Sequence, residues 1–392
     1  MSEWPIVALK DAADIVSGGT PKSGVDEYWD GDVPWVTPKD LGKIDGPYIS
    51  KTPRNITEVG LKNSSATLLP ANSVLLSSRA PIGHVAINTI AMATNQGFKS
   101  LVPKPGVSDA GYLYHWLRAN RAYLEGLGNG ATFKEVSKAV VAKVEIPLPP
   151  IEEQRRIAAI LDHADALRAK RREALAHLDE LTKSIFVDMF GDPVANPRGY
   201  AQVPLTEIGH LYSGGTPAKT VAENWTGSLP WFSPKDLKRN DLFDSRDHIS
   251  ESVPDRSSLK LLPSDTVVFV VRGMILAHSF PVSVLRVPAT INQDMKAILP
   301  SIDVRVDYLA SCLRVQAGHV LAQVSTAAHG TKRLDAEGMS KVSIPLPPID
   351  EQDEFVEAIG NLNRLKSESS DSLGELDALF ASLQSRAFRG EL

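Results

Sequence analysis

The chain has 392 residues, of which 43% are hydrophobic and 23% are charged. A chain of this length exceeds one ordinary domain, so we expect two or three domains with well-packed cores. The formal net charge of −5 argues against an indiscriminate nucleic-acid binder, which usually carries an excess of basic residues. A local basic surface is compatible with this charge.

Two further features bear on the compartment. The first residues, Met1 to Pro5, lack the basic segment and apolar stretch of a secretory signal, and no apolar run approaches the ~20 residues of a membrane helix. The single cysteine, Cys312, excludes an intramolecular disulfide framework and suits a reducing compartment. We therefore predict a cytoplasmic protein without a membrane partner.

Residues 1–149 are predicted to form a first globular domain. Residues 73–78 and 85–87 have the apolar and β-branched content of strands, and residues 112–117 have the pattern of a helix. Short strands separated by Gly and Pro turns, with few long helices, favour an α+β fold.

Residues 150–191 have the pattern of one long helix that follows a Pro-rich hinge. From Ile157 to Ile185, apolar or seam residues recur at alternating steps of three and four, which is typical of a coiled coil, and Gly191 ends the pattern. A helix of about forty residues is ~60 Å long, so it cannot bury its apolar stripe against one small domain.

The rest of the chain repeats this plan. Five segments recur at offsets of 196 to 198 residues: Ser17–Pro21 at Ser213–Pro217, Pro34-Trp35 at Pro230-Trp231, Pro38–Leu41 at Pro234–Leu237, Asn95-Gln96 at Asn292-Gln293, and the hinge Ile146–Ile151 at Ile344–Ile349. Small changes in offset indicate loop insertions. The duplication predicts a second domain at 192–347, with strands at 266–271 and 342–344 and a helix at 308–313.

Residues 348–392 are predicted to form a second long helix. The alternating steps run from Phe355 to Ala387, and both helices have a polar middle, with Arg171 in the first and Lys366 in the second. Because the chain returns through a whole domain, the pattern favours an antiparallel coiled coil between the two helices. The alternative is two separate amphipathic helices, each packed on its own domain.

Motifs for catalysis are missing from the sequence. An adenine methyltransferase needs an Asp/Asn-Pro-Pro-aromatic loop and a Gly-rich turn for its methyl donor, and neither is present; nor is there a phosphate loop for ATP. The nine histidines include no His-x-x-x-His pair. We predict no catalytic residue, no cofactor and no metal. Gly18-Gly19 and Gly214-Gly215 could cradle a phosphate, but a tight turn is favoured.

The ordered set of repeated motifs resembles the specificity (S) subunit of type I restriction–modification systems. The resemblance covers essentially the whole chain and rests on the repeated segments above, Ser78-Arg79 with Gly83, Gly130–Lys134, the hinge with its Glu-Gln, and the closing Arg386–Leu392. In the second copy Asp294 stands where Gly97 stands, and Gly330–Arg333 follows Gly130–Lys134 only loosely.

The resemblance implies two target-recognition domains that each read one part of a bipartite DNA site. It also implies that the two helices act as a ruler for the unread spacer and dock two modification (adenine methyltransferase) subunits, which a restriction (nuclease and translocase) subunit can join. Residues 77–88 and 271–283 differ between the copies. Readers of different half-sites would differ in this way, and so would copies that drifted after duplication.

Polar residues in the repeated motifs are the candidate contacts to double-stranded DNA. Arg can bind guanine with two hydrogen bonds and Gln can do the same for adenine, whereas Lys and Thr suit phosphates. The candidates are Lys39, Arg79, Gln96, Thr132 and Lys134 in the first domain, and Lys235, Arg272, Gln293, Lys332 and Arg333 in the second. The alternative for each is a surface charge or a structural hydrogen bond.

Two other functions compete with DNA specificity. One is an enzyme with an unfamiliar site, against which the missing motifs argue. The other is a coiled-coil scaffold whose two domains bind proteins or other ligands without DNA specificity, which the negative net charge permits. Sequence-independent DNA binding that salt abolishes would favour the scaffold.

Overall fold

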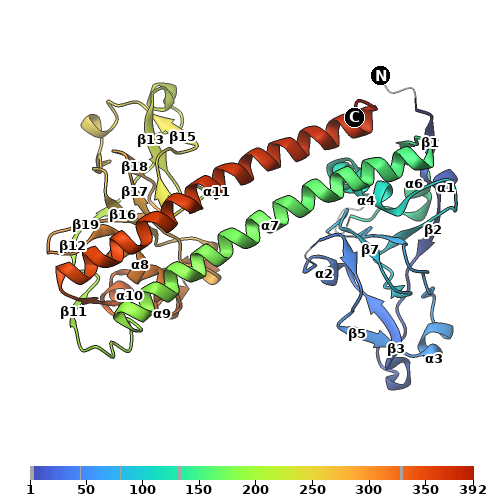
Figure 1. Cartoon of the computed structure of the whole chain (residues 1–392), viewed down its shortest axis with the longest axis horizontal. Helices are drawn as coiled ribbons and strands as arrows, with labels where there is room; N and C mark the ends of the chain where they lie inside the picture. The colour runs from blue at the N-terminus through green and yellow to red at the C-terminus, as the bar shows by residue number, and fades with distance from the viewer. Residues whose placement is uncertain (1–3, 45, 80, 130–133, 327–329) are drawn as a thin grey trace. The chain divides into compact units, whose positions relative to one another are not determined.

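The computed structural model describes residues 4–44, 46–79, 81–129, 134–326 and 330–392. The chain divides into two compact units: unit 1 comprises Met1–Glu173 with Ser370–Leu392, and unit 2 comprises Ala174–Ser369. Each unit contains one sheet-bearing part, the first or second domain, and parts of two long helices, α7 (Ile151–Phe190) and α11 (Ile349–Arg389) (Figure 1). The predicted mixed α+β fold with two long helices is confirmed.

The first domain is built on a five-stranded and a three-stranded sheet. The larger sheet has the order β2 (Ala13–Ser17), β9 (Lys99–Pro103), β6 (Val74–Leu76), β7 (Val85–Asn88), β4 (Tyr48–Ile49). The smaller has the order β5 (Arg54–Ile56), β3 (Trp29–Val36), β8 (Ala93–Thr94). A separate two-stranded ladder joins β1 (Ile6–Ala8) to β10 (Glu145–Pro147).

Short helices complete the first domain. They are α1 (Leu9–Ala12), α2 (Pro38–Leu41), α3 (Glu58–Lys62), α4 (Ala110–Ala119), α5 (Arg121–Gly126), α6 (Lys138–Ala142) and the 3-10 turn η1 (Asp26–Tyr28). The side chain of Asp109 caps α4 by accepting from the backbone N–H of Tyr112 at 3.0 Å. One face of α4 buries Leu113 and Leu117 in the same apolar core as Val74 of β6.

The second domain repeats this topology. Its five-stranded sheet has the order β12 (Gly209–Ser213), β19 (Met295–Pro300), β16 (Thr266–Val270), β17 (Val282–Leu285), β14 (Asp241–Leu242). Its three-stranded sheet has the order β15 (Asp247–Ile249), β13 (Leu229–Phe232), β18 (Thr290–Ile291). Two ladders join β11 (Ala201–Pro204) to β22 (Ser343–Leu346) and β20 (Ser325–Thr326) to β21 (Lys332–Arg333).

The helices of the second domain are α8 (Val306–Val315), α9 (Ala317–Ala322), α10 (Ala336–Ser340) and the 3-10 turns η2 (Ala222–Trp225), η3 (Pro254–Arg256) and η4 (Met274–Ala277). They match those of the first domain in part, since α8, α9 and α10 correspond to α4, α5 and α6, whereas α1, α2 and α3 have no α-helical counterpart. The strands predicted at 73–78, 85–87, 266–271 and 342–344 are present as β6, β7, β16 and β22, and the predicted helices at 112–117 and 308–313 lie within α4 and α8.

The Pro-rich hinges hold each long helix to its own domain. The buried Gln154 donates to the carbonyl oxygens of Pro149 and Val107 and accepts from the N–H of Asp109. In unit 2, Gln352 donates to Pro347 and accepts from the N–H of Arg305. A buried amide with all these partners fixes the direction in which a helix leaves its domain.

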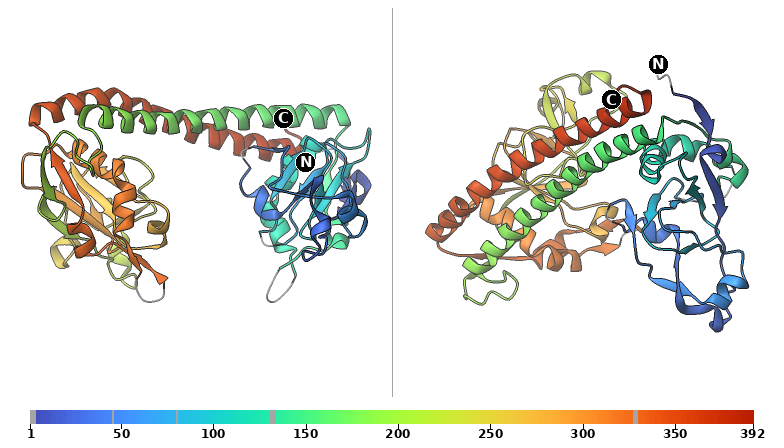
Figure 2. Two further views of the ribbon diagram at one scale, coloured as in Figure 1. Left: turned by 90° about the horizontal axis from the view of Figure 1, so that it is seen from below. Right: turned by 45° about the vertical axis from the view of Figure 1, so that its right-hand side comes forward.

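The two long helices pair in antiparallel fashion. In unit 1, Arg168 of α7 pairs with Asp377 of α11, where the two helices run side by side (Figures 1 and 2). In unit 2, Asp179 of α7 pairs with Lys366 of α11 at 2.8 Å. A step of 11 residues forward on α7 therefore matches a step of 11 residues backward on α11. The antiparallel coiled coil is confirmed, and the alternative of two separately packed helices is wrong.

Aromatic side chains attach the helix pair to the second domain. Phe186 of α7 lies 5.4 Å, ring centroid to ring centroid, from both Tyr308 of α8 and Phe355 of α11. All three are fully buried. In unit 1 another aromatic contact joins Tyr112 of α4 to Phe388 of α11 at 5.6 Å. Within the described part of the chain, no helix combines the length and apolar character that crossing a membrane requires.

Candidate nucleic-acid interface

The repeated Gly-Gly-Thr-Pro segment is an irregular stretch that directly follows a strand, β2 in the first domain and β12 in the second. In the first domain the N–H groups of Gly18 and Gly19 donate to the carbonyl oxygens of Phe98 and Thr94, and the indole of Trp35 donates to Gly19. In the second domain the indole of Trp231 donates to Gly215 in the same way, at 2.9 Å. Since the amides of Gly18 and Gly19 already have acceptors, the phosphate-cradle interpretation is wrong there. The tight-turn interpretation is wrong as well, because these amides donate to distant carbonyl oxygens and the segment is assigned no turn.

The threonines of this segment orient the predicted glutamines at the surface. The hydroxyl of Thr20 donates to the side-chain carbonyl of Gln96, and Thr216 does the same for Gln293. Both glutamines are exposed. Among the described residues their NH₂ groups have no hydrogen-bond partner, so each glutamine can donate to a ligand while its carbonyl remains oriented by the threonine.

The predicted lysines of the Pro-Lys-Asp-Leu motif are also exposed. A capping arrangement sets the backbone around Lys39, because Asp40 accepts from the N–H and the hydroxyl of Thr37 at 2.8 and 2.7 Å. Asp236 accepts from Ser233 in the same way beside Lys235. The motif therefore uses its aspartate for structure and presents its lysine to solvent, which suits contact with a phosphate.

In the first domain, Arg79 belongs to a small charged cluster. Its Nε lies 2.9 Å from a carboxylate oxygen of Glu135, and the ammonium of the nearly buried Lys99 lies 3.3 Å from the other oxygen. Burial acts to raise the pKa of Glu135, but the hydrogen bonds and charges of Arg79 and Lys99 outweigh it and lower this pKa below its ordinary value. Glu135 is therefore ionised at neutral pH.

In the second domain, Arg272 has a different acidic partner. Its Nε lies 2.6 Å from a carboxylate oxygen of Asp294. The backbone bridge that joins Arg79 to Glu135 in the first domain joins Arg272 to Arg333 in the second. The ammonium of Lys296 donates to the hydroxyl of Ser213 at 2.9 Å. Burial, followed by the charge of Arg333, lowers the pKa of Lys296.

A groove of about 1060 Å³ runs along this part of the second domain. Three of the five residues predicted for this domain line it, namely Lys235, Arg272 and Gln293. The carbonyl of Lys332 accepts from the N–H of Gly273, a residue of the groove wall, so β21 lies beside the groove. Lys332 itself donates to Thr326, and Arg333 is exposed.

Paired tryptophans also contribute to this surface, and they were not among the residues predicted to contact DNA. Trp225 and Trp231 line the groove and meet edge to face at 5.2 Å. In the first domain Trp29 and Trp35 form the same contact at 5.1 Å, and the guanidinium of Arg54 lies 3.9 Å from the ring centre of Trp29. The recurrence of both tryptophans was the available signal. Arg54 and Asp247 hold the same strand position opposite the second tryptophan and give the two surfaces opposite charge there.

Two further residues of the first domain, Thr132 and Lys134, were predicted to contact DNA. Thr132 lies outside the described residues. Lys134 is exposed and directly precedes Glu135. Among the residues that the structure describes, no three His, Cys, Asp or Glu side chains come together in a way that could hold a metal ion.

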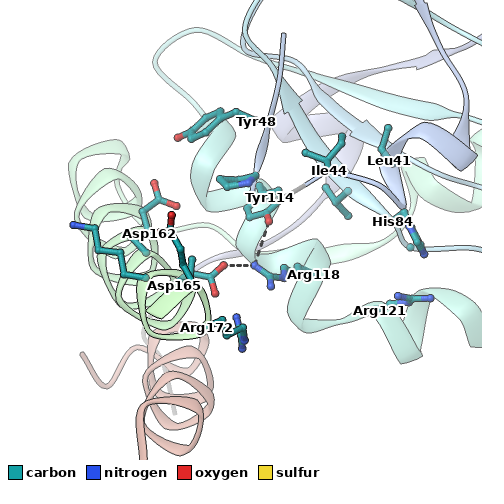
Figure 3. A pocket seen from close by; sticks show the side chains of 18 residues that line it. Leu41, Ile44, Tyr48, His84, Tyr114, Arg118, Arg121, Asp162, Asp165 and Arg172 are labelled. Atoms are coloured by element: carbon teal, nitrogen blue, oxygen red, sulfur yellow. Dashed lines mark hydrogen bonds and ion pairs between the residues drawn. The ribbon is translucent and has the colours of Figure 1, made fainter. Parts of the chain in front are cut away.

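A second concavity, of about 960 Å³, lies in unit 1 between the first domain and α7 (Figure 3). The guanidinium of Arg118 of α4 reaches the hydroxyl of Tyr114 and the carboxylate of Asp165 of α7. Burial, followed by the charge of Arg121, lowers the pKa of His84 on its wall. None of the residues predicted to contact DNA lines this concavity. Its polar contacts join α4 to α7.

Comparison with known proteins points to one family. The family model described as type I restriction modification DNA specificity domain matches residues 1–177 and 197–373. The specificity subunit of the type I restriction enzyme MjaIX from Methanocaldococcus jannaschii is 33% identical over 288 residues, or 69% of this chain. The EcoR124I/EcoR124II specificity subunit from Escherichia coli is 32% identical over 67% of this chain.

The two relatives are longer than the matched stretch, which spans 66% and 65% of their lengths, just under two thirds. The crystal structure of a type I restriction–modification S subunit from M. genitalium is similar in fold, with a TM-score of 0.57 and 15% identity. That similarity covers 98% of this chain and 96% of the other. The likeness therefore extends over both domains and both long helices.

Proposed function

Because the chain belongs to the type I restriction–modification DNA specificity family, we propose that it reads a bipartite DNA site and directs adenine methyltransferase subunits to that site. Each sheet-bearing domain reads one half of the site. The observation that carries this proposal is the duplicated surface. Arg79, Gln96 and Lys39 in the first domain correspond to Arg272, Gln293 and Lys235 in the second, and all six are wholly or partly exposed.

The chemistry of these side chains suits the edges of bases and the phosphates that flank them. An arginine presents two N–H groups in one plane to guanine O6 and N7, a glutamine presents an amide to adenine, and a lysine binds a phosphate as a point charge. Double-stranded DNA is thus the ligand that this set recognises. The groove beside Arg272 supplies a concave surface with three of these residues on its wall.

The remaining parts of the proposal follow from the family. The chain acts as a non-catalytic subunit in the cytoplasm, two modification subunits dock on its helices, and a nuclease and translocase subunit joins them where the system has one. The absence from the sequence of a methyl-donor turn and of an ATP phosphate loop supports a non-catalytic part.

Methylation mapping by long-read sequencing tests the function directly. Cells that carry the chain and its methyltransferase partner are compared with cells from which only this chain is deleted. We expect a split adenine-methylated motif that disappears on deletion and returns when the chain is supplied again. An unchanged pattern of methylation would contradict the proposal, and the scaffold function would then account better for the chain.

A further inference from the structure

The two domains hold an equivalent arginine with carboxylates from different positions. Arg79 pairs with Glu135, which is 56 residues later in the chain. Arg272 pairs with Asp294, which is 22 residues later. The side chains of the two arginines are exposed to a similar extent, 46% and 48%. In both pairs the carboxylate contacts Nε of the guanidinium.

Backbone hydrogen bonds establish which positions are equivalent. The N–H of Ser78 donates to the carbonyl of Gly97 at 2.7 Å, and the N–H of Val271 donates to the carbonyl of Asp294 at 2.8 Å. Gly97 and Asp294 therefore occupy the same place in the turn. The bridges from Arg79 to Glu135 and from Arg272 to Arg333 likewise make Glu135 and Arg333 equivalent.

The second domain thus differs from the first in charge at two equivalent positions. It has gained a carboxylate at the position of Gly97 and replaced the carboxylate of Glu135 with the guanidinium of Arg333. Each domain still has one carboxylate on the Nε of its arginine. Lys99 and Lys296 occupy the same position in the sheet, opposite Ser17 and Ser213.

A carboxylate on Nε has a definite effect on what the arginine can bind. A charge-assisted hydrogen bond fixes the plane of the guanidinium. Among the described residues, the two terminal nitrogens of Arg79 and Arg272 have no hydrogen-bond partner. Those nitrogens form a planar fork of donors, and guanine is the base that presents two acceptors, O6 and N7, side by side in the major groove.

We propose that Glu135 and Asp294 are specificity-determining positioning residues, each of which orients its arginine for a guanine in the half-site that its domain reads. This inference rests on the proposed function. An ordinary surface ion pair would contribute little stability and would leave base preference unchanged. A positioning carboxylate instead changes discrimination at one base of one half-site.

The test is made on the full chain with its methyltransferase subunits, with the methylated motif as the readout. Glu135→Gln keeps the size of the side chain and removes its charge. We expect roughly a ten- to hundredfold loss of discrimination for guanine at one position of the first half-site, with the second half-site and the spacer unchanged. Glu125→Gln is the matched control, since Glu125 pairs with Arg121 elsewhere in unit 1 and should leave the motif intact.

Relocating the carboxylate separates positioning from simple loss of stability. In Gly97→Asp with Glu135→Gln, the acid occupies the position that Asp294 has in the second domain, and we expect discrimination for guanine to return. A conservative rescue is available in the second domain. There Asp294→Gly should relax one base of the second half-site, whereas Asp294→Glu, which keeps a carboxylate at that position, should retain the preference for guanine. If Gly97→Asp does not fit its turn, the comparison of these two variants still tests positioning.

Three outcomes would overturn the inference. They are an unchanged motif in both Glu135→Gln and Asp294→Gly, relaxation that neither the relocated carboxylate of Gly97→Asp nor the retained carboxylate of Asp294→Glu prevents, and a wild-type motif that lacks guanine in the half-sites. All three are compatible with a bipartite motif that depends on the chain, so they would refute the inference and leave the proposed function standing. Loss of the bipartite motif from wild type would refute the proposed function itself.

Discussion

Gly18 lies so close to Asn95 that a Cβ atom on Gly18 would be 1.9 Å from the carbonyl oxygen of Asn95. Gly214 has the same relationship to Asn292, at 2.1 Å. Each glycine lies two residues before the threonine that orients a surface glutamine. The requirement for glycine is therefore steric. The close backbone approach that it permits lies beside the surface that is proposed to bind DNA.

Gly18→Ala is expected to destabilise unit 1 by at least about 2 kcal/mol, because backbone atoms must move to admit the methyl group. Urea unfolding followed by tryptophan fluorescence measures the change. Gly24→Ala is the control, since a Cβ there meets nothing within 4 Å, and this variant should be neutral or slightly stabilising. Equal urea midpoints for Gly18→Ala and Gly24→Ala would show that the backbone around Gly18 accommodates a methyl group without loss of stability.

Arg168 is expected to stabilise the helix pair in unit 1. Its guanidinium lies 4.3 Å from the ring centre of Phe380 and contacts the carboxylates of Asp165 and Asp377, with only 13% of the side chain exposed. Arg168→Ala should cost about 1–3 kcal/mol because it removes these contacts together. In Arg172→Ala the lost side chain is 49% exposed, so the cost should be less than about 0.5 kcal/mol. Chemical unfolding measures the free energy of unfolding of both variants. Similar losses of stability would contradict the expectation that Arg168 stabilises the helix pair more than Arg172 does.

The register of the helix pair allows a matched shortening. Within unit 1, residues 167–173 of α7 lie opposite residues 372–378 of α11, as the pairing of Arg168 with Asp377 requires. Deleting both segments removes about 10 Å from each helix and keeps the seam aligned, since seven residues make nearly two turns. We expect a spacer shorter by at most about three base pairs, with both half-sites unchanged, when the methylated motif is mapped. An unaltered spacer would refute the ruler function of the helices.

Lys235 and Arg272 should differ in how they affect DNA binding. Lys235→Ala is expected to weaken binding to all sequences alike and to reduce the salt slope of the affinity by about 1, as loss of one phosphate contact does. Arg272→Ala should cost about 1–3 kcal/mol on the correct site and relax one base position. Titrations of the assembled complex over a range of salt concentrations distinguish them. A base-specific effect of Lys235→Ala would reverse the assignment.

The thiol of Cys312 is expected to be unreactive in the folded protein. Cys312 is fully buried in the core of the second domain, and burial raises the pKa of its thiol well above the ordinary value. The reactive thiolate is therefore suppressed at pH 8, where a free cysteine is partly ionised. Mass spectrometry after treatment with iodoacetamide should find Cys312 unmodified until urea unfolds unit 2. Rapid alkylation without denaturant would indicate local opening around α8.

Much of the fold could be predicted because it depends on local patterns. The heptad steps predicted α7 and α11, and the repeat of Pro-Pro-Ile-x-Glu-Gln predicted two equivalent hinges. The hinge glutamines Gln154 and Gln352 could be seen only as part of a motif. Their burial and their contacts with Pro149 and Pro347 appear when the domains fold around them.

The candidate site was predicted less completely. Position in the repeat was enough to select Arg79, Arg272 and Gln293, and the structure places the latter two on one groove. The sequence showed that Asp294 replaces Gly97 but could not show what this replacement does. Nor did it single out Arg54, whose contact with Trp29 depends on the pairing of β3 with β5.

The sequence by itself determined the duplication, the order of the elements and the two seams, because spacing along the chain encodes them. Only the tertiary structure decided which carboxylate contacts each arginine. Glu135 and Asp294 approach equivalent arginines from positions 56 and 22 residues away, and an ion pair forms between whatever groups the folded strands bring within reach. Linear spacing does not specify such a contact, since it depends on strand pairing and on the place of each side chain in its turn.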